Sequence, residues 1–168
     1  GDWQYEFIAG TRNECVQRLM NGEIDLLPGV LDTAYQRARF DLVAHSMGDT
    51  TLLLAARNGV GTLQTGKNLR MGYMPEIYDG MDPGLRTFAR SEGMTFQLEN
   101  YGYERALMSD FEDEKLDGFI TESMGMRTNV PLVGAFRNAP AYLAVRKGNT
   151  ALLQELEMAA DQMHLAIP

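Results

Sequence analysis

The chain has 168 residues, of which 45% are apolar and 23% charged, so it is long enough to bury a core as one domain or two small ones. The formal net charge of −8 argues against nucleic acid as a partner, because an acidic surface repels a polyanion. No apolar run reaches the roughly 18 residues of a membrane helix, and no basic-then-apolar signal segment opens the chain. We therefore expect a mature soluble protein or an excised piece of a larger one. The single cysteine, Cys15, excludes an intramolecular disulfide and a cysteine-based metal site.

The first residues predict a strand followed by a helix. Trp3, Tyr5 and Phe7 alternate with polar residues, which is typical of a half-buried strand, and we expect that strand to end at residue 10. The next residues, TRNE, form a Thr-x-x-Glu capping box. A helix is therefore predicted to begin after Thr11 and to stop at Gly22.

Three further elements are predicted before the middle of the chain. Residues 24–30 are almost continuously apolar, which is typical of a parallel strand buried on both faces. Residues 33–39 have the pattern of a short helix, and residues 51–57, TLLLAAR, that of a strand. Glycines then predict an irregular connection at 59–66.

The second half predicts similar elements. Asp82 and Pro83 favour a helix start, with the Asp as the cap and the Pro in the first turn. In chain order we predict a strand at 69–74, a helix at 82–93, a strand at 94–98, a helix at 103–111, strands at 113–122 and 141–146, and a helix from 150 to about 164.

Parts of the sequence recur. IDLL at 24–27 matches LDGF at 116–119 with an offset of 92, the alternating aromatic pattern at 3–7 matches 94–98 with an offset of 91, and LLLAARNG at 52–59 matches AYLAVRKG at 141–148 with an offset of 89. These matches favour two similar βα lobes over a chance likeness of apolar units. Because the strand and helix at 69–93 have no earlier counterpart, we expect the first lobe to lack its first strand and helix.

The order of motifs resembles a known family. The stretches are GDWQYEFIAGTRNECVQRLMNGEIDLLPGV, DTAYQRARFDL, LQTGKNLRMGY, EDEKLDGFITES and YLAVRKGN, which together cover nearly the whole chain. They resemble type 2 periplasmic solute-binding proteins, in particular the family 3, amino-acid-binding branch and its extracytoplasmic sensor-domain relatives. DLLPGV and GDWQYEF look more like the sensor domains than the transport-associated proteins.

The resemblance implies an α/β fold of two lobes, joined by two crossover hinge strands, with a ligand in the cleft between them. We expect the first lobe, incomplete, at 1–51 with 147–168, the second lobe at 58–139, and the hinge strands at about 51–57 and 141–146. Closure about the hinge around a ligand that touches both lobes would then be the output.

The first lobe departs from the family's ligand site. The family's carboxylate-binding Arg falls on Gln36, and Arg37 is not assumed to replace it, because one helical position rotates a side chain by about 100°. The family's small and hydroxyl-bearing positions fall on 29–33, where Leu31 replaces the usual Ser and Thr33 keeps a hydroxyl.

The second lobe departs as well. Met74-Pro75-Glu76 replaces a turn that offers donors to a carboxylate, whereas Glu122 lies where relatives carry an acidic residue for an amino group. An Arg-free cleft with Glu122, Glu76 and Asp32 favours an amine or other cation, or no small molecule. The alternative for Glu122 is a solvated carboxylate at a strand end. Asp25 and Asp117 are expected to hydrogen-bond the local backbone.

Several signals are interpreted as structural. GTLQTGKN at 61–68 nearly matches a phosphate-binding loop, but Asn68 replaces the hydroxyl and a strand follows where a helix is needed. His45 and His164 lack metal-ligand spacing. No serine lies in a G-x-S-x-G elbow. We expect no catalytic residues, cofactor or metal.

The leading interpretation is a non-enzymatic solute-binding or sensor domain, periplasmic or extracellular, that binds an amino-acid-like or cationic ligand. It would act on a membrane-anchored transport or signalling partner. One alternative is a degenerate, ligand-free interaction module; another is a dehydratase-like enzyme with Glu122 as its acid. An exposed sheet edge in the first lobe is a candidate dimer contact.

Overall fold

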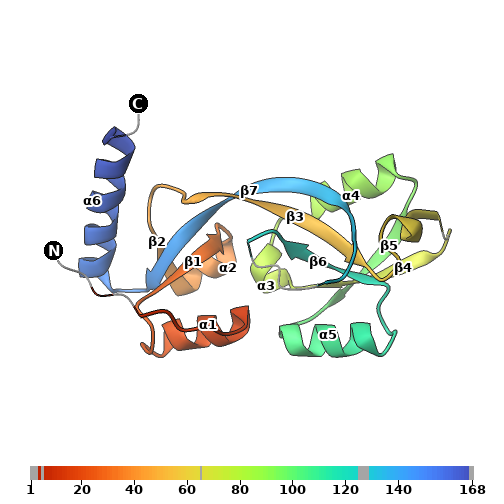
Figure 1. The fold of residues 1–168 in the computed structure, drawn as a ribbon, viewed down its shortest axis with the longest axis horizontal. Coiled ribbons are helices and arrows are strands. Elements are labelled where there is room, and N and C mark those ends of the chain that lie inside the picture. The colour runs from red at the N-terminus through yellow and green to blue at the C-terminus, as the bar shows by residue number, and fades with distance from the viewer. Residues whose placement is uncertain (1–3, 5, 65, 125–128, 167–168) are drawn as a thin grey trace.

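The structure is a computed structural model that describes residues 4, 6–64, 66–124 and 129–166 (Figure 1). Helices and strands alternate along most of the chain. Their order is α1 (Arg12–Met20), β1 (Leu26–Leu31), α2 (Ala34–Arg39), β2 (Phe40–Leu42), β3 (Gly48–Ala56), the 3-10 helix η1 (Gly59–Gln64), β4 (Asn68–Tyr73), α3 (Pro75–Tyr78), α4 (Asp82–Ser91), β5 (Thr95–Asn100), α5 (Glu104–Glu112), β6 (Gly118–Glu122), β7 (Leu132–Arg146) and α6 (Thr150–Ala166).

Two long strands cross the middle of the molecule. β3 and β7 pair antiparallel, and the elements gather at their two ends: α1, β1, α2, β2 and α6 in a first lobe, and β4, β5, β6 and α3 to α5 in a second lobe (Figure 1). The strand order is β1-β7-β3-β6-β4-β5, and β2 also pairs with β7. Because the crossing strands enter both lobes, the lobes share one continuous sheet rather than forming two separate ones. β3 and β7 are longer than the predicted hinge strands.

The sequence repeat is reflected in the strand pairing. Leu26 pairs with Val145 and Leu27 with Ala144. The positions that the repeat makes equivalent pair in the same way: Gly118 with Ala56, and Phe119 with Ala55. β1, which follows α1, and β6, which follows α5, therefore meet a crossing strand in matching antiparallel register, which supports the interpretation of two similar βα units.

The direction of β1 differs from its prediction. β1 pairs antiparallel with β7 and not parallel with a neighbour. A continuous apolar run indicates burial but carries no information about strand direction, which the partner decides. Parallel pairing is found in the second lobe, where β4 runs parallel with β5 and β6.

The prediction of an amino-terminal strand is wrong for residues 6–10, which the structure describes. Trp3 and Tyr5 lie outside the described residues. Residues 6–10 form no strand, and Phe7 is 95% exposed. The alternating pattern is present in the sequence, but no described strand pairs with this segment. Its backbone therefore lacks the hydrogen bonds between strands that would hold it in a sheet.

The predicted N-cap is correct for α1 but not for α4. Thr11 caps α1 in a complete capping box with Glu14, as predicted. α4 instead has Met81 at its N-cap, and Asp82 is a helical residue that pairs with Arg86. α3 and β2, which are only four and three residues long, were not predicted.

Each lobe has its own core, and one residue joins them. The first-lobe core is built around Leu19, Val30 and Phe40. The larger second-lobe core contains Leu54, Met71 and Leu85, and it also takes in Leu31 from the end of β1. Apolar packing therefore continues from one lobe to the other.

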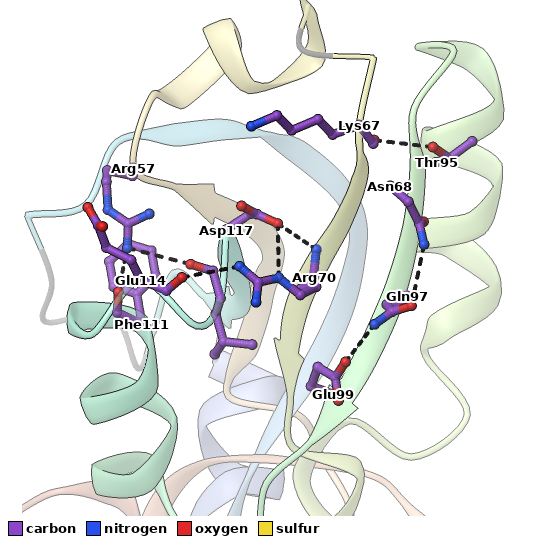
Figure 2. A network of polar contacts seen from close by, with 11 residues as sticks. Arg57, Lys67, Asn68, Arg70, Thr95, Gln97, Glu99, Phe111, Glu114 and Asp117 are labelled. Atoms are coloured by element: carbon purple, nitrogen blue, oxygen red, sulfur yellow. Dashed lines mark hydrogen bonds and ion pairs between the residues drawn. The ribbon is translucent and has the colours of Figure 1, made fainter.

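Asp117 belongs to a network of polar contacts within the second lobe (Figure 2). The Asp117 carboxylate accepts a hydrogen bond from the Arg70 backbone N–H at 2.8 Å and lies 3.7 Å from the Arg70 Nε. Arg57 donates to the carbonyl of Phe111 and stacks over its ring. Asp117 bonds backbone as predicted, but the N–H belongs to Arg70, 47 residues earlier, so the prediction of a local contact is wrong. The role of Asp117 is to tie β4 to the start of β6.

Candidate functional site

A large cavity lies between the lobes. Its volume is about 1830 Å³. The first lobe contributes residues 4 and 6–10, α1, residues 23–28 and the start of α6, so the cavity continues along this lobe; the second lobe contributes α3, α5 and β6. Its lining residues with charged or polar-aromatic side chains are Glu6, Arg12, Glu23, Asp25, Tyr78, Glu104 and Glu122.

Glu122 is the most deeply buried charge in this cavity. It is the last residue of β6, where it pairs with Leu52 of β3, and its side chain is 1% exposed. Neither carboxylate oxygen has a hydrogen bond of good geometry among the described residues. A buried carboxylate without such bonds is costly, because it loses its hydration shell. Glu122 is therefore not the solvated strand-end residue of the alternative interpretation.

Arg12 provides the counter-ion from the opposite lobe. Its Nη2 lies 2.8 Å from Glu122 Oε1, and its side chain is 14% exposed. Its Nη1 donates a hydrogen bond to the carbonyl of Gly29 at 3.2 Å. The contact with Glu122 has the distance of an ion pair but not the direction of a hydrogen bond, which is why both carboxylate oxygens retain acceptor capacity.

Arg12 was missed by the sequence reasoning, although a signal for it exists. Arg12 is the first residue of α1, directly after its Thr11 cap. A cation at the positive end of a helix opposes the helix dipole. Such a placement is slightly unfavourable, and a nearby anion such as Glu122 offsets it.

Burial dominates the electrostatics of Glu122. Desolvation raises its pKa above the usual 4.5, and the carboxylate of Glu104 raises it further. The guanidinium of Arg12 and the hydroxyl of Thr50 lower the pKa and so oppose this shift. The described lining carries five carboxylates and one guanidinium, so the cavity has an excess of negative charge.

Hydroxyl groups surround the end of β6. Thr50 of β3 is fully buried, and its Oγ1 accepts a hydrogen bond from the Met124 backbone N–H. The Ser123 Oγ accepts one from the Thr51 backbone N–H at 2.9 Å. These contacts fix the chain that follows Glu122 against a crossing strand, so the position of the carboxylate depends on both.

Three side chains at or near the positions where the family resemblance put the ligand are packed in a core. Leu31, Met74 and Tyr78 are all buried in the second-lobe core. Burial raises the pKa of the Tyr78 hydroxyl, and the nearby Glu122 raises it further. Leu31 does not line the cavity and has a packing role, whereas Met74 and Tyr78 also contribute to the cavity wall.

Thr33 and Gln36 have local structural roles. Both are buried, and the Thr33 hydroxyl caps α2 by accepting a hydrogen bond from the Gln36 backbone N–H at 3.2 Å. The Gln36 Oε1 is buried without a hydrogen-bond partner among the described residues. Neither side chain lines the cavity.

Arg37 and Glu76 also lie outside the cavity. Arg37 is exposed and pairs with Asp32, to which its Nη2 donates at 3.0 Å. Glu76 is exposed at the start of α3. Of the six predicted ligand-binding residues, Glu122 alone lines this cavity.

Tyr35 links the two lobes beside these residues. Burial raises its pKa, and the nearby carboxylate of Glu76 raises it further. The hydroxyl also accepts a hydrogen bond from Arg39 at 2.6 Å. Arg39, Tyr35 and Glu76 thus form a polar bridge from α2 to α3, which we name the α2–α3 bridge.

The site contains groups suited to binding. Among residues 4, 6–64, 66–124 and 129–166, no group of three His, Cys, Asp or Glu side chains could hold a metal ion. In the same residues no helix combines the length and apolar character needed to span a bilayer. A facing carboxylate and guanidinium in an open cavity can bind complementary charges on a small molecule.

Comparison with solved structures identifies the fold. An ancestral arginine-binding protein bound to glutamine matches with 19% identity over 95% of this chain and 73% of that chain, at a TM-score of 0.59. An amino acid ABC transporter substrate-binding protein, AbpA from Streptococcus pneumoniae bound to L-arginine, matches with 13% identity over 96% and 71%, at 0.58. An ancestral amino acid-binding protein that is a precursor of cyclohexadienyl dehydratase matches with 15% identity over 95% and 71%, at 0.53.

These likenesses concern the fold. No family model and no curated protein matches the chain. The predicted fold class, an α/β periplasmic-binding-protein-like fold of two lobes, is confirmed by these neighbours and by the crossing of β3 and β7.

Proposed function

We propose that this protein is an extracytoplasmic solute-binding domain that holds one small amino acid between its lobes. The observation that carries this proposal is Glu122, a buried carboxylate with free acceptor capacity on the wall of a cavity of about 1830 Å³. An ammonium group has three donors and no acceptor, so it would satisfy these oxygens and remove the cost of their desolvation.

The charge of the cavity favours a ligand with a cationic side chain. Glu6, Glu23, Asp25 and Glu104 line the cavity in addition to Glu122. Their summed potential attracts cations and repels anionic side chains. We therefore expect arginine or lysine to bind more tightly than glutamate. Arginine is also the ligand in the names of several neighbours with this fold, which supports the proposal by analogy.

The output would be a change in the angle between the lobes. We propose boundaries at residues 1–51 with 147–168 for the first lobe and 58–139 for the second, joined where β3 and β7 cross. A ligand that contacts both lobes stabilises the closed state by its differential affinity. We propose a membrane-anchored transport or signalling protein as the partner that reads this closure.

A thermal-shift screen tests the proposal. The twenty amino acids, putrescine and agmatine would be tested with the wild-type protein and with Glu122→Gln. A ligand at 100 times its dissociation constant adds about 2.7 kcal/mol to the free energy of unfolding, which is a shift of several degrees. We expect arginine or lysine to stabilise the wild type and Glu122→Gln to lose that effect. No stabilisation by any amino acid would refute the proposal.

A ligand-free interaction module is the second candidate. The packing of Leu31, Met74 and Tyr78 in one core favours it, because the chain's own side chains occupy part of the cleft. This candidate expects no ligand to stabilise the protein and the lobes to keep one angle. Small-angle X-ray scattering with and without arginine distinguishes the two candidates, since only a solute-binding domain changes its dimensions on ligand addition.

A further inference from the structure

The Arg12 side chain occupies the place that a ligand cation would take beside Glu122. We propose that Arg12 binds the carboxylate of the ligand and that, without ligand, it is the counter-ion of Glu122. A zwitterionic amino acid would then replace the Arg12–Glu122 pair by two pairs, one between its carboxylate and Arg12 and one between its ammonium group and Glu122. This inference rests on the proposed function and names the ligand class and a second binding residue. It also corrects the expectation of an Arg-free cleft.

Charge balance selects a zwitterion over simpler ions. An amine that displaced Arg12 from Glu122 would break the ion pair described for Arg12 without replacing it, and a free carboxylate bound to Arg12 would do the same to Glu122. Removing one partner of a buried pair is strongly unfavourable. An amino acid carries both charges, so its carboxylate pairs with Arg12 while its ammonium pairs with Glu122, and no buried charge is left alone.

The guanidinium is positioned for this exchange. The capping box of Thr11 and Glu14 fixes the start of α1, and Arg12 Nη1 is held by the carbonyl of Gly29. A guanidinium has five donors in a rigid fork, so Arg12 can keep the Gly29 bond and present its Nη2 edge to a ligand carboxylate. Only the Nη2 contact with Glu122 has to be given up.

The next residue of α1 already ties the lobes together. The Asn13 Oδ1 accepts a hydrogen bond from the Glu104 backbone N–H at 2.9 Å, and its amide donates to the Gly102 carbonyl at 3.4 Å. This contact crosses the cleft beside Arg12 but carries no charge. Asn13→Ala is therefore a matched control, because it weakens an interlobe contact without altering the ion pair.

Calorimetric titration of the whole chain with two ligands tests the exchange. L-arginine and agmatine share the guanidinium and an amino group, but agmatine lacks the carboxylate. We expect wild type and Asn13→Ala to prefer L-arginine by about 10-fold or more, the effect of one charge-assisted pair. In Arg12→Ala that preference should fall to about 1, because agmatine keeps its contact with Glu122 while L-arginine loses its anchor.

Each other outcome has a defined meaning. If Arg12→Ala keeps the wild-type preference, the inference is overturned and the proposed function stands. If the wild type binds neither ligand nor any other amino acid, both are overturned. If Arg12→Ala does not fold, the charge-free double variant Arg12→Met with Glu122→Gln is compared with Glu122→Gln alone. A further loss of L-arginine affinity of about 10-fold in the double variant supports the exchange, and equal affinity of the two variants contradicts it.

Discussion

The Nη2 of Arg12 lies 2.8 Å from the Oε1 of Glu122, and this contact joins the first turn of α1 to the end of β6 across the cleft. Three unfavourable features coincide in it. A cation lies at the positive end of a helix, a carboxylate is buried, and that carboxylate has no well-directed hydrogen bond among the described residues. Replacing a buried ion pair by a hydrophobic pair is often neutral or stabilising, so a role in binding is consistent with keeping these charges.

Arg12→Met should destabilise the protein strongly. Loss of one partner of a buried pair costs about 3–5 kcal/mol, because the other charge remains without compensation. The double variant with Glu122→Gln should recover most of this loss. Urea unfolding of the four proteins of this cycle at pH 7.5 measures the coupling. Additive effects of the two substitutions would show that the pair does not interact.

Stability should depend on the protonation of Glu122. Its pKa is raised in the folded state, chiefly by burial, so the folded protein binds this proton more tightly than the unfolded chain does. The stabilising contribution is therefore full below the ordinary value of 4.5 and is lost as the pH rises through the raised pKa. Glu122→Gln cannot ionise and has no such loss.

The measurement for this effect is the difference in free energy of unfolding between Glu122→Gln and wild type, followed from pH 4 to pH 8. We expect the variant to gain stability relative to the wild type as the pH rises. Arg12, Glu104 and Tyr78 face the carboxylate, and they are the same in both proteins. A difference that moves the other way would show that the Arg12 pair outweighs burial.

Gly118→Ala should disrupt the start of β6. A Cβ at Gly118 would lie 2.2 Å from the Ala55 carbonyl oxygen, which is far closer than any real contact, so the strand would have to shift. We expect a loss of about 2 kcal/mol or more, as for other overpacked cores. The control is Gly102→Ala, where no atom lies within 4 Å of the added Cβ. Equal stability of the two variants in urea unfolding would contradict the close pairing of Gly118 with β3.

Tyr35→Phe should loosen the lobes. The substitution removes the hydroxyl that accepts the Arg39 hydrogen bond near the Glu76 carboxylate in the α2–α3 bridge. A single hydrogen bond contributes about 0.5–1.5 kcal/mol, so we expect a small loss of stability together with a larger radius of gyration in solution scattering. Tyr101→Phe is the matched control, because its hydroxyl bonds to Asp110 within the second lobe. An unchanged radius for Tyr35→Phe would show that the bridge does not restrain the lobes.

Local signals in the sequence predicted much of the fold. The capping box at Thr11 and Glu14 predicted α1, and the βα repeat predicted which residues of β1 and β6 are equivalent, because both patterns depend on neighbouring residues. Strand direction was wrong for β1 because direction depends on the partner. The strand predicted at residues 3–10 fails at Phe7 because alternation alone cannot supply a partner strand.

The site was predicted only in part, for a physical reason. Glu122 was predicted because it lies in the EDEKLDGFITES motif at the position where the family carries an acidic residue. Arg12 and Asn13 contact residues on β6 and α5, which are distant in the sequence. A local sequence pattern cannot predict these contacts, because it does not show which helix start will lie next to which strand end. The positive charge in the first turn of α1 was the one local signal, since it opposes the helix dipole. Gln36 and Thr33 were expected in the cleft but are used to build α2.

Isothermal titration of L-arginine into the whole protein at pH 7.5 tests the central claim most directly. The account predicts binding of one equivalent to the wild type and a loss of affinity of about 10-fold or more in Glu122→Gln, because the ligand ammonium loses its charged partner. Equal affinity in both proteins, or no binding of any amino acid to the wild type, would contradict it.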